Sequence, residues 1–169
     1  MGFLQDAIKV FKKKDIVFTE KRQEAEDVFS FLFEKARDIT WNAGQHGLFR
    51  ITHTKIKNPI VPFTVASAPS EEVIRITTKI RKESGEFKKA LMELAPGMTL
   101  QLSGPVGSFT LKEDSPSLLI AGGIGITPYR SMLKQLEAEG RGGNQPIRLL
   151  YLDSGKTFVF RDELEEMAG

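Results

Sequence analysis

The chain of 169 residues lacks cysteine and contains a single tryptophan and two histidines. The absence of cysteine excludes disulfides, thiolate metal sites, a cysteine nucleophile and an iron–sulfur centre on this chain. The sequence also has no run of about 18 apolar residues, which a membrane-spanning helix requires. The formal net charge of +2 creates no strong field that would attract nucleic acid. We therefore expect no nucleic-acid partner, and because the histidines and carboxylates are scattered we expect no metal site.

The N-terminal segment, residues 1–14, has one apolar helical face. This face consists of Phe3, Leu4, Ala7, Ile8 and Phe11. It fits either a short helix packed on its own domain or an amphipathic segment lying on a membrane surface or a partner. The segment lacks the features of a secretory signal. We therefore expect a cytoplasmic protein, peripheral to a membrane only if residues 1–14 bind one.

Residues 15–113 have the pattern of short strands separated by turns. The predicted strands are Asp15–Thr19, Asp27–Phe33, Leu48–Thr52, Ile60–Ser67, Val73–Ile80, Met98–Leu102 and Ser108–Leu111. One helix is expected over Glu86–Leu94, where apolar residues recur at helical spacing. In the strand over 73–80, isoleucines alternate with Arg75 and Lys79, so both cations are expected on its outer face. Many short strands with one helix predict a small antiparallel β-barrel.

Residues 114–169 have a different pattern, in which strands and helices alternate. The predicted order is strand Leu118–Ala121, helix Tyr129–Glu139, strand Ile147–Leu152 and helix Phe160–Met167. This order predicts a parallel α/β unit. The acidic residues of the last helix, Glu163 among them, are expected on a solvated face. Two strands are too few for a six-stranded dinucleotide-binding domain, so we expect a fragment, a truncated product or half of an assembly.

A glycine-rich loop joins the first strand of this unit to its first helix. The loop reads Gly122-Gly123-Ile124-Gly125-Ile126-Thr127-Pro128. Glycines let backbone N–H groups approach a diphosphate closely, and the helix N-terminus adds a partial positive charge. Thr127 is expected to cap the helix and Pro128 to be its first residue, where a missing N–H costs nothing. A tight turn without a ligand is the alternative, but three glycines in four positions favour phosphate binding.

Two further patterns lie in the barrel region. Pro62-Phe63-Thr64 places an aromatic ring beside a hydroxyl group, a pair that can stack on a flat ring and hydrogen-bond to it. Ser84-Gly85-Glu86 opens the single helix, whose N-terminus can hold an anion. Each of these two patterns, taken alone, fits ordinary core packing as well.

The order of these motifs resembles the ferredoxin–NADP reductase family, in which a flavin-binding Greek-key barrel precedes a nicotinamide-nucleotide-binding α/β domain. The similarity runs from about Asp27 to the C-terminus and includes Trp41–His46, which looks like the family's G-Q turn. It implies an N-terminal segment over 1–14, an FAD-binding barrel over 15–113 and a partial NAD(P)-binding domain over 114–169.

The resemblance also implies residue roles. Phe63 would pack on the isoalloxazine ring, Thr64 would lie near the flavin nitrogen that exchanges hydride, and Thr127 would face the nicotinamide. The FAD-binding residues implied are Pro62, Phe63, Thr64, Val65, Thr78, Lys79, Ile80, Gly85, Glu86, Phe87 and Lys88. The NAD(P)H-binding residues implied are Gly122, Gly123, Gly125, Thr127, Pro128 and Asp153.

Two positions leave the choice of cofactor open. The arginine that meets the FAD diphosphate in the family is Val61 here, so Lys88 is a candidate to supply the missing charge, and FMN remains an alternative. Asp153 ends the second parallel strand, where a carboxylate can bind a ribose diol and repel a 2′-phosphate. Lys156 has the opposite effect, and the balance slightly favours NADH.

These expectations describe a flavoprotein reductase that passes hydride from NAD(P)H to FAD and electrons to a protein or small-molecule acceptor. The alternative is a non-catalytic flavin-binding or electron-relay module. In either case a partner chain or self-association could complete the α/β domain.

Overall fold

The computed structural model describes residues 12–112, 115–141 and 146–168. The apolar face predicted for the N-terminal segment therefore lies outside the described residues. Lys13 and Lys14 of that segment already belong to the first strand. Among the described residues, no helix is long and apolar enough to cross a membrane.

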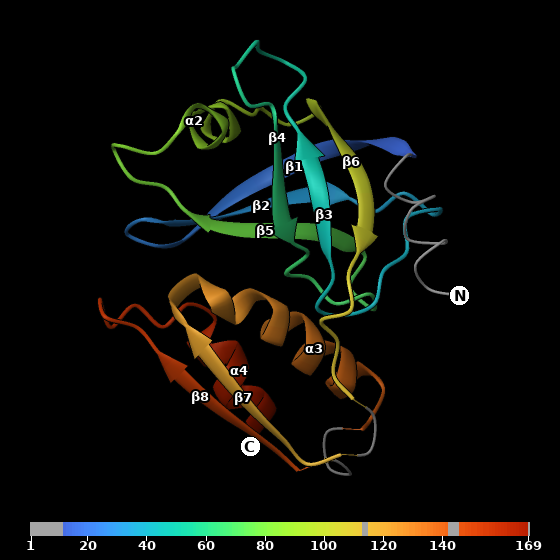
Figure 1. The fold of residues 1–169 in the computed structure, drawn as a ribbon, viewed down its shortest axis with the longest axis vertical. Helices are drawn as coiled ribbons and strands as arrows, with labels where there is room; N and C mark the ends of the chain where they lie inside the picture. The colour runs from blue at the N-terminus through green and yellow to red at the C-terminus, as the bar shows by residue number, and fades with distance from the viewer. Residues whose placement is uncertain (1–11, 113–114, 142–145, 169) are drawn as a thin grey trace.

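The first unit is a curled antiparallel sheet of six strands (Figure 1). Its strands are β1 (Lys13–Ala25), β2 (Val28–Glu34), β3 (His46–Arg50), β4 (Ile60–Thr64), β5 (Val73–Lys79) and β6 (Thr99–Val106). Their order in the sheet is β4-β3-β6-β1-β2-β5, so β4 and β5 are its edges. Just beyond β4, the amide of Ala66 donates to the carbonyl of Arg75 at 2.7 Å. The sheet is thus barrel-like without closing into a continuous ladder.

Aromatic packing fills the inside of the curled sheet. Phe18, Phe31, Phe33 and Phe49 are buried, and the rings of Phe18 and Phe33 meet edge to face with centroids 5.6 Å apart. Helix α2 (Glu86–Met92) adds its apolar side, including Phe87, to the same core. These side chains keep the two edge strands in place around the barrel interior.

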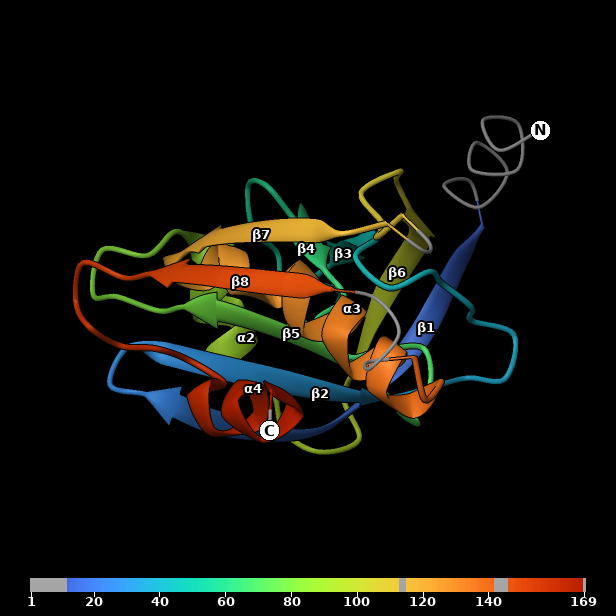
Figure 2. The ribbon, with the colours of Figure 1, turned by 90° about the horizontal axis from the view of Figure 1, so that it is seen from below.

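The second unit is a two-stranded parallel sheet with two helices. It consists of β7 (Ser117–Gly122), the 3₁₀ helix η1 (Gly123–Ile126), α3 (Thr127–Ala138), β8 (Ile147–Leu152) and α4 (Arg161–Ala168). Helix α3 lies between this small sheet and the barrel in Figure 1, and Figure 2 shows β7 and β8 side by side. The opposite face of the sheet exposes apolar side chains, namely Leu118, Ile120, Leu150 and Leu152.

The predicted strand Ser108–Leu111 is wrong. Strand β6 already ends at Val106, and Gly107 then adopts a φ of +117°, which turns the chain out of the sheet. The following residues run irregularly toward the second unit, where the ring of Phe109 packs on Tyr129 with centroids 5.6 Å apart. This segment therefore connects the two units instead of closing the barrel.

Candidate functional site

The glycine-rich loop lies where β7 and β8 reach their carboxyl ends. A groove of about 630 Å³ opens there, lined by Lys79, Gly122, Gly123, Ile124, Leu152, Asp153 and Ser154. The carboxyl ends of parallel strands are the usual place for a nucleotide in open α/β sheets. Lys79 belongs to β5, so the barrel supplies one wall of this groove.

The three glycines of the loop differ in whether the protein itself requires glycine there. Gly123 has a φ of +51°, a conformation that favours glycine for backbone reasons alone. At Gly122 and Gly125 the backbone is not left-handed, and an added Cβ would meet no protein atom within 4 Å. Neither packing nor backbone conformation therefore requires glycine at 122 or 125. Open space beside the backbone fits a ligand that approaches these amides closely.

The prediction that Thr127 caps the helix is wrong. Thr127 is already the first residue of α3, its hydroxyl donates to the carbonyl of Ile124 at 3.2 Å, and the N-cap residue is Ile126. The reason is that η1 leads directly into α3, so the turn before the helix is itself helical and has no capping geometry. Pro128 is therefore the second residue of α3 and not, as was expected, the first.

Asp153 shapes the loop that follows β8. Its Oδ1 accepts hydrogen bonds from the amides of Gly155 at 2.8 Å and Thr157 at 3.2 Å. Its Oδ2 lies 3.6 Å from Nζ of Lys79 and faces Gly123. The hydrogen bond from Thr157, with help from Gly155 and Lys79, lowers the pKa of the Asp153 carboxyl. The aspartate is thus charged in the groove, and one of its oxygens is committed to its own loop.

The residues expected to contact the flavin come from the two edge strands of the barrel. Phe63 of β4 is half-buried and packs on Phe87 of α2, with ring centroids 5.6 Å apart and planes inclined by 35°. Thr64 is also half-buried and pairs with His46 of β3 in the ladder. Lys79 ends β5 on the other edge. The open edges therefore bring together side chains from β4 and β5 without a ladder between them.

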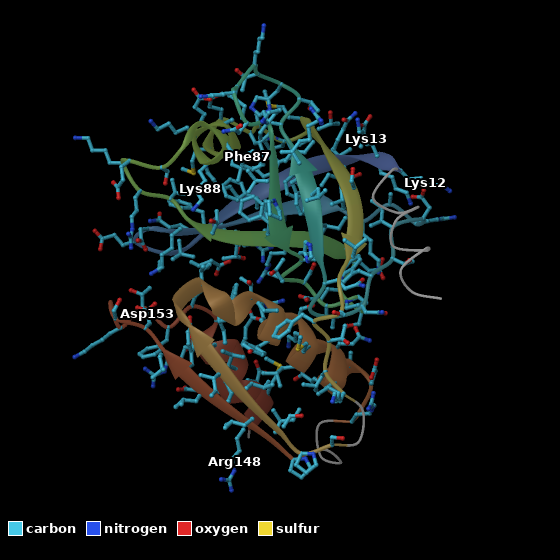
Figure 3. All side chains as sticks on the ribbon, in the orientation of Figure 1. Lys12, Lys13, Phe87, Lys88, Arg148 and Asp153 are labelled. Carbon is cyan, nitrogen blue, oxygen red and sulfur yellow. The ribbon has the colours of Figure 1, made fainter. Side chains whose placement is uncertain are left out.

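The start of α2 has room beside its backbone. Its N-cap residue, Gly85, has extended backbone, no capping side chain and no protein atom within 4 Å of an added Cβ. Lys88 donates from Nζ to the carbonyl of Lys79 at 2.9 Å, and burial together with the charge of Arg81 lowers its pKa. Figure 3 shows Lys88 on the barrel and Asp153 on the second unit, toward the same side of the molecule.

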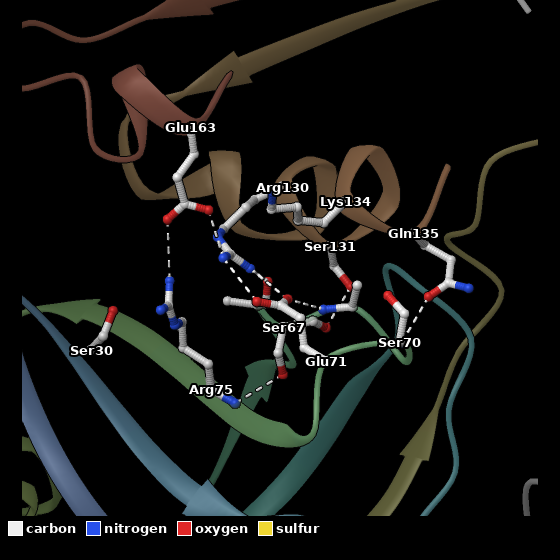
Figure 4. A network of polar contacts seen from close by, with 12 residues as sticks. Ser30, Ser67, Ser70, Glu71, Arg75, Arg130, Ser131, Lys134, Gln135 and Glu163 are labelled. Carbon is white, nitrogen blue, oxygen red and sulfur yellow. Dashed lines mark hydrogen bonds and ion pairs between the residues drawn. The ribbon is translucent and has the colours of Figure 1, made fainter. Parts of the chain in front are cut away.

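A buried polar network joins α3 and α4 to the barrel, and the sequence did not predict it (Figure 4). Arg130 of α3 donates from Nη1 to the carbonyl of Ala66 and to Glu71, both at 2.9 Å. Its Nη2 donates to Glu71 at 3.1 Å and to Glu163 of α4 at 2.6 Å. The other carboxylate oxygen of Glu163 lies 3.5 Å from Nη1 of Arg75. Two arginines and two glutamates therefore meet where the units touch.

The expectation that Arg75 lies on an outer face is wrong, whereas Glu163 keeps 33% of its side chain exposed on α4. Arg75 is only 6% exposed because the second unit covers the face of β5 that was expected to be outer. Burial, with a contribution from Arg130, lowers the pKa of Arg75. The sequence held one signal that Arg130 faces inward. Arg130 lies three residues before Leu133, which was predicted to point inward, and residues at this spacing share a helix face.

The pairing of Arg130 with Glu71 and Glu163 stabilises the charged forms of Arg130 and Glu71. Burial opposes ionisation of Glu71, but the hydrogen bonds and charge of Arg130 outweigh it and lower the pKa of this carboxyl below its ordinary value. Burial also opposes the charged form of Arg130, and the pairing with Glu71 and Glu163 outweighs it and raises the pKa. Both groups are therefore charged at neutral pH.

Two family models match the chain, one over the barrel and one over the second unit. The model of the oxidoreductase FAD-binding domain matches residues 15–111, and that of the oxidoreductase NAD-binding domain matches residues 119–169. Ferredoxin–NADP reductase B of Sorangium cellulosum is 37% identical over 112 residues, which are 63% of this chain and 44% of that protein. A flavohemoprotein of Burkholderia sp. (strain TH2) is 31% identical over 160 residues, 90% of this chain and 39% of that protein.

Solved structures agree with the fold. The crystal structure of flavohemoglobin from Malassezia yamatoensis, which holds FAD and heme, superposes with a TM-score of 0.75 at 25% identity. The superposition covers 92% of this chain and 42% of that one. The chain spans less than half the length of the curated relatives it matches first. By the match of both domain models, the chain belongs to the ferredoxin–NADP reductase family of oxidoreductases with an FAD-binding and an NAD-binding domain.

Proposed function

We propose that this chain forms the flavin- and nicotinamide-binding part of a reductase that takes hydride from NAD(P)H. The observation that carries the proposal is the open space at Gly122 and Gly125, which nothing in the protein itself requires. A diphosphate placed there would receive backbone N–H groups at the start of α3. The two domain models divide the chain between residues 111 and 119, which supports units over 15–113 and 114–169.

The residues present fit FAD at the barrel edges. When bound, FAD supplies the redox chemistry, because its isoalloxazine accepts a hydride, one proton with two electrons, and NAD(P)H becomes NAD(P)⁺. Phe63 offers an aromatic face for that ring, and Thr64 offers a hydroxyl beside it. Gly85 and Lys88 at the start of α2 would hold the diphosphate. Lys88 would supply the positive charge that is missing because Val61 stands in place of the family's arginine.

On the nicotinamide side, the chain binds and orients instead of exchanging protons. Gly122, Gly123 and Gly125 would hold the diphosphate, while Thr127 and Pro128 begin the helix behind it. The Oδ2 atom of Asp153 faces Gly123 in the groove, where a negative charge favours the ribose diol of NADH over the 2′-phosphate of NADPH. The electrons would pass from the flavin to a protein or small-molecule acceptor.

Anaerobic reduction tests the proposal directly. The purified protein is loaded with FAD, freed of excess flavin and mixed with NADH or NADPH while its yellow absorbance is followed. Bleaching by either nucleotide, faster with NADH, is the expected result. A yellow protein that neither nucleotide bleaches would make the chain a relay module, and a colourless protein that retains no FAD would remove both functions.

A further inference from the structure

Arg130 connects the two residues that the proposed function places beside the reacting rings. Thr127 lies three residues before Arg130, almost one turn earlier on α3. Ala66, whose carbonyl accepts from Nη1 of Arg130 at 2.9 Å, follows Thr64 by two residues. One side chain therefore links the nicotinamide-facing start of α3 to the chain segment that leaves the flavin-facing strand.

The surroundings of Arg130 hold it in one orientation. Its side chain is 2% exposed and lies between the carboxylates of Glu71 and Glu163, which come from the barrel and from α4. The ring of Phe160 lies 5.1 Å from its guanidinium carbon. Phe160 adopts a φ of +64°, a left-handed conformation that is strained for a non-glycine residue. This backbone conformation occurs at the residue whose ring packs against the guanidinium of Arg130.

A guanidinium bound from several sides is directional in a way that an apolar contact is not. Nη1 and Nη2 of Arg130 together reach one carbonyl and two carboxylates, so sliding of α3 along the barrel would break several hydrogen bonds at once. Arg130 does not line the groove at the glycine-rich loop. Its influence on a nucleotide would therefore act through the position of α3.

We propose that Arg130 is a positioning residue for hydride transfer, which fixes Thr127 and the glycine-rich loop relative to Thr64. This inference rests on the proposed function. A misplacement of about 1 Å between reacting groups can cost about 100-fold in rate. Loss of Arg130 is therefore expected to slow flavin reduction at saturating NADH and to leave the affinities for FAD and NADH nearly unchanged.

The single tryptophan provides a readout that needs no cofactor. The indole Nε1 of Trp41 donates to the carbonyl of Ser67 at 3.2 Å, and the hydroxyl of Ser131 donates to the same carbonyl at 2.7 Å. Trp41 is 5% exposed. If α3 moves away from the barrel, Ser67 loses the Ser131 hydrogen bond and the indole gains water. The emission maximum of Trp41 would then shift to longer wavelength.

The experiment compares wild type with Arg130→Gln, Arg130→Lys and the matched control Lys134→Gln. Lys134 lies one turn further along α3, at the edge of the network, and its ammonium pairs with Glu137 on the same helix instead of with Glu71 or Glu163. Measured for each protein are FAD and NADH dissociation constants, the rate of flavin reduction at saturating NADH, and the emission of Trp41 in the FAD-free protein. Arg130→Lys keeps a cation, so it remains informative if Arg130→Gln does not fold.

The expected result is a loss of about 10- to 100-fold in reduction rate for both Arg130 variants, dissociation constants within about 2-fold of wild type, and a red-shifted Trp41 emission. Lys134→Gln should match wild type in all three. Equal rates in the lysine variant and the control, or a rate loss matched by loss of FAD or NADH, would overturn the proposal. If NADH does not reduce even the wild type, the proposed function fails, and the emission of Trp41 alone then decides whether Arg130 holds the units together.

Discussion

Replacement of Gly125 by alanine separates a ligand-binding glycine from a structural one. Gly125 lies in η1, its φ is not left-handed, and an added Cβ would meet no protein atom within 4 Å. The folded chain therefore tolerates a methyl group there. A nucleotide diphosphate that packs directly on this backbone would not tolerate it. Gly125→Ala is expected to leave the protein folded and to weaken NADH binding, and Gly122→Ala is expected to do the same.

The added methyl group is expected to raise the stability of the fold and to lower the affinity for NADH. A glycine-to-alanine change at a compatible position stabilises a protein by about 0.4–1 kcal/mol, because the unfolded chain has fewer conformations to lose. The same methyl group would push the diphosphate off the backbone amides, and the loss of one such charge-assisted hydrogen bond corresponds to about 1.5–3 kcal/mol. At about 1.4 kcal/mol per factor of ten, NADH affinity should fall by about 10- to 150-fold.

The assay combines urea unfolding with titration of NADH into the FAD-loaded protein. Two glycines of other kinds serve as controls. At Gly97 an added Cβ would meet no atom within 4 Å, but the backbone φ is +91°. Gly97→Ala should therefore lower the stability and leave the affinity for NADH intact. At Gly44 an added Cβ would overlap the carbonyl of Phe109 and the side chain of Met132, so Gly44→Ala should destabilise more strongly. An unchanged dissociation constant for NADH in both Gly122→Ala and Gly125→Ala would refute the assignment of the loop.

Three further changes test other parts of the structure. Phe31→Ala removes a fully buried ring from the barrel core and should lower the free energy of unfolding in urea by about 3–5 kcal/mol. Lys88→Ala should weaken FAD binding in a fluorescence titration, whereas its exposed neighbour control Lys89→Ala should not; equal retention by both variants would contradict the role of Lys88. Because the folded-state pKa of Glu71 lies below its ordinary 4.5, its ionised form stabilises the fold fully above about pH 4.5, and this contribution disappears as the pH falls through the lower folded-state value. The stability advantage of wild type over Glu71→Gln in urea should therefore shrink below pH 4.5, and a constant difference would exclude Glu71 as its source.

Local patterns were sufficient for most of the fold. The alternation of isoleucines in β5, the helical spacing in α2 and the change of pattern before β7 each depend on neighbours within about ten residues. The strand expected over Ser108–Leu111 failed for a non-local reason. This segment turns away at Gly107 to contact α3, and no periodicity within the segment records a contact with a distant helix.

The site shows the same limit. The glycine-rich loop could be proposed as a diphosphate site because its residues are consecutive, and Asp153 as a ribose ligand because it directly follows a strand. The network around Arg130 was missed because its members lie on four separate parts of the chain, where each one looks like an ordinary surface charge. Arg75 in particular alternates with isoleucines as an outward residue does, and only the second unit buries it. Ion pairs between the two units do not change the spacing of apolar residues along the sequence of either unit.

The composition of this contact also bears on what it is for. Moving the two guanidiniums out of water costs several kcal/mol per ion, which pairing with the partly exposed carboxylates of Glu71 and Glu163 barely offsets, so an apolar seam of the same size would hold the units together at least as well. The network even leaves Nε of Arg75 and of Arg130 without hydrogen-bond partners. Adhesion therefore does not account for these charges. The proposed positioning role does account for them, because a directional contact gives up some stability to define one relative placement of Thr127 and Thr64, and a hydride-transfer rate between groups held there would depend on that placement more than a binding constant would.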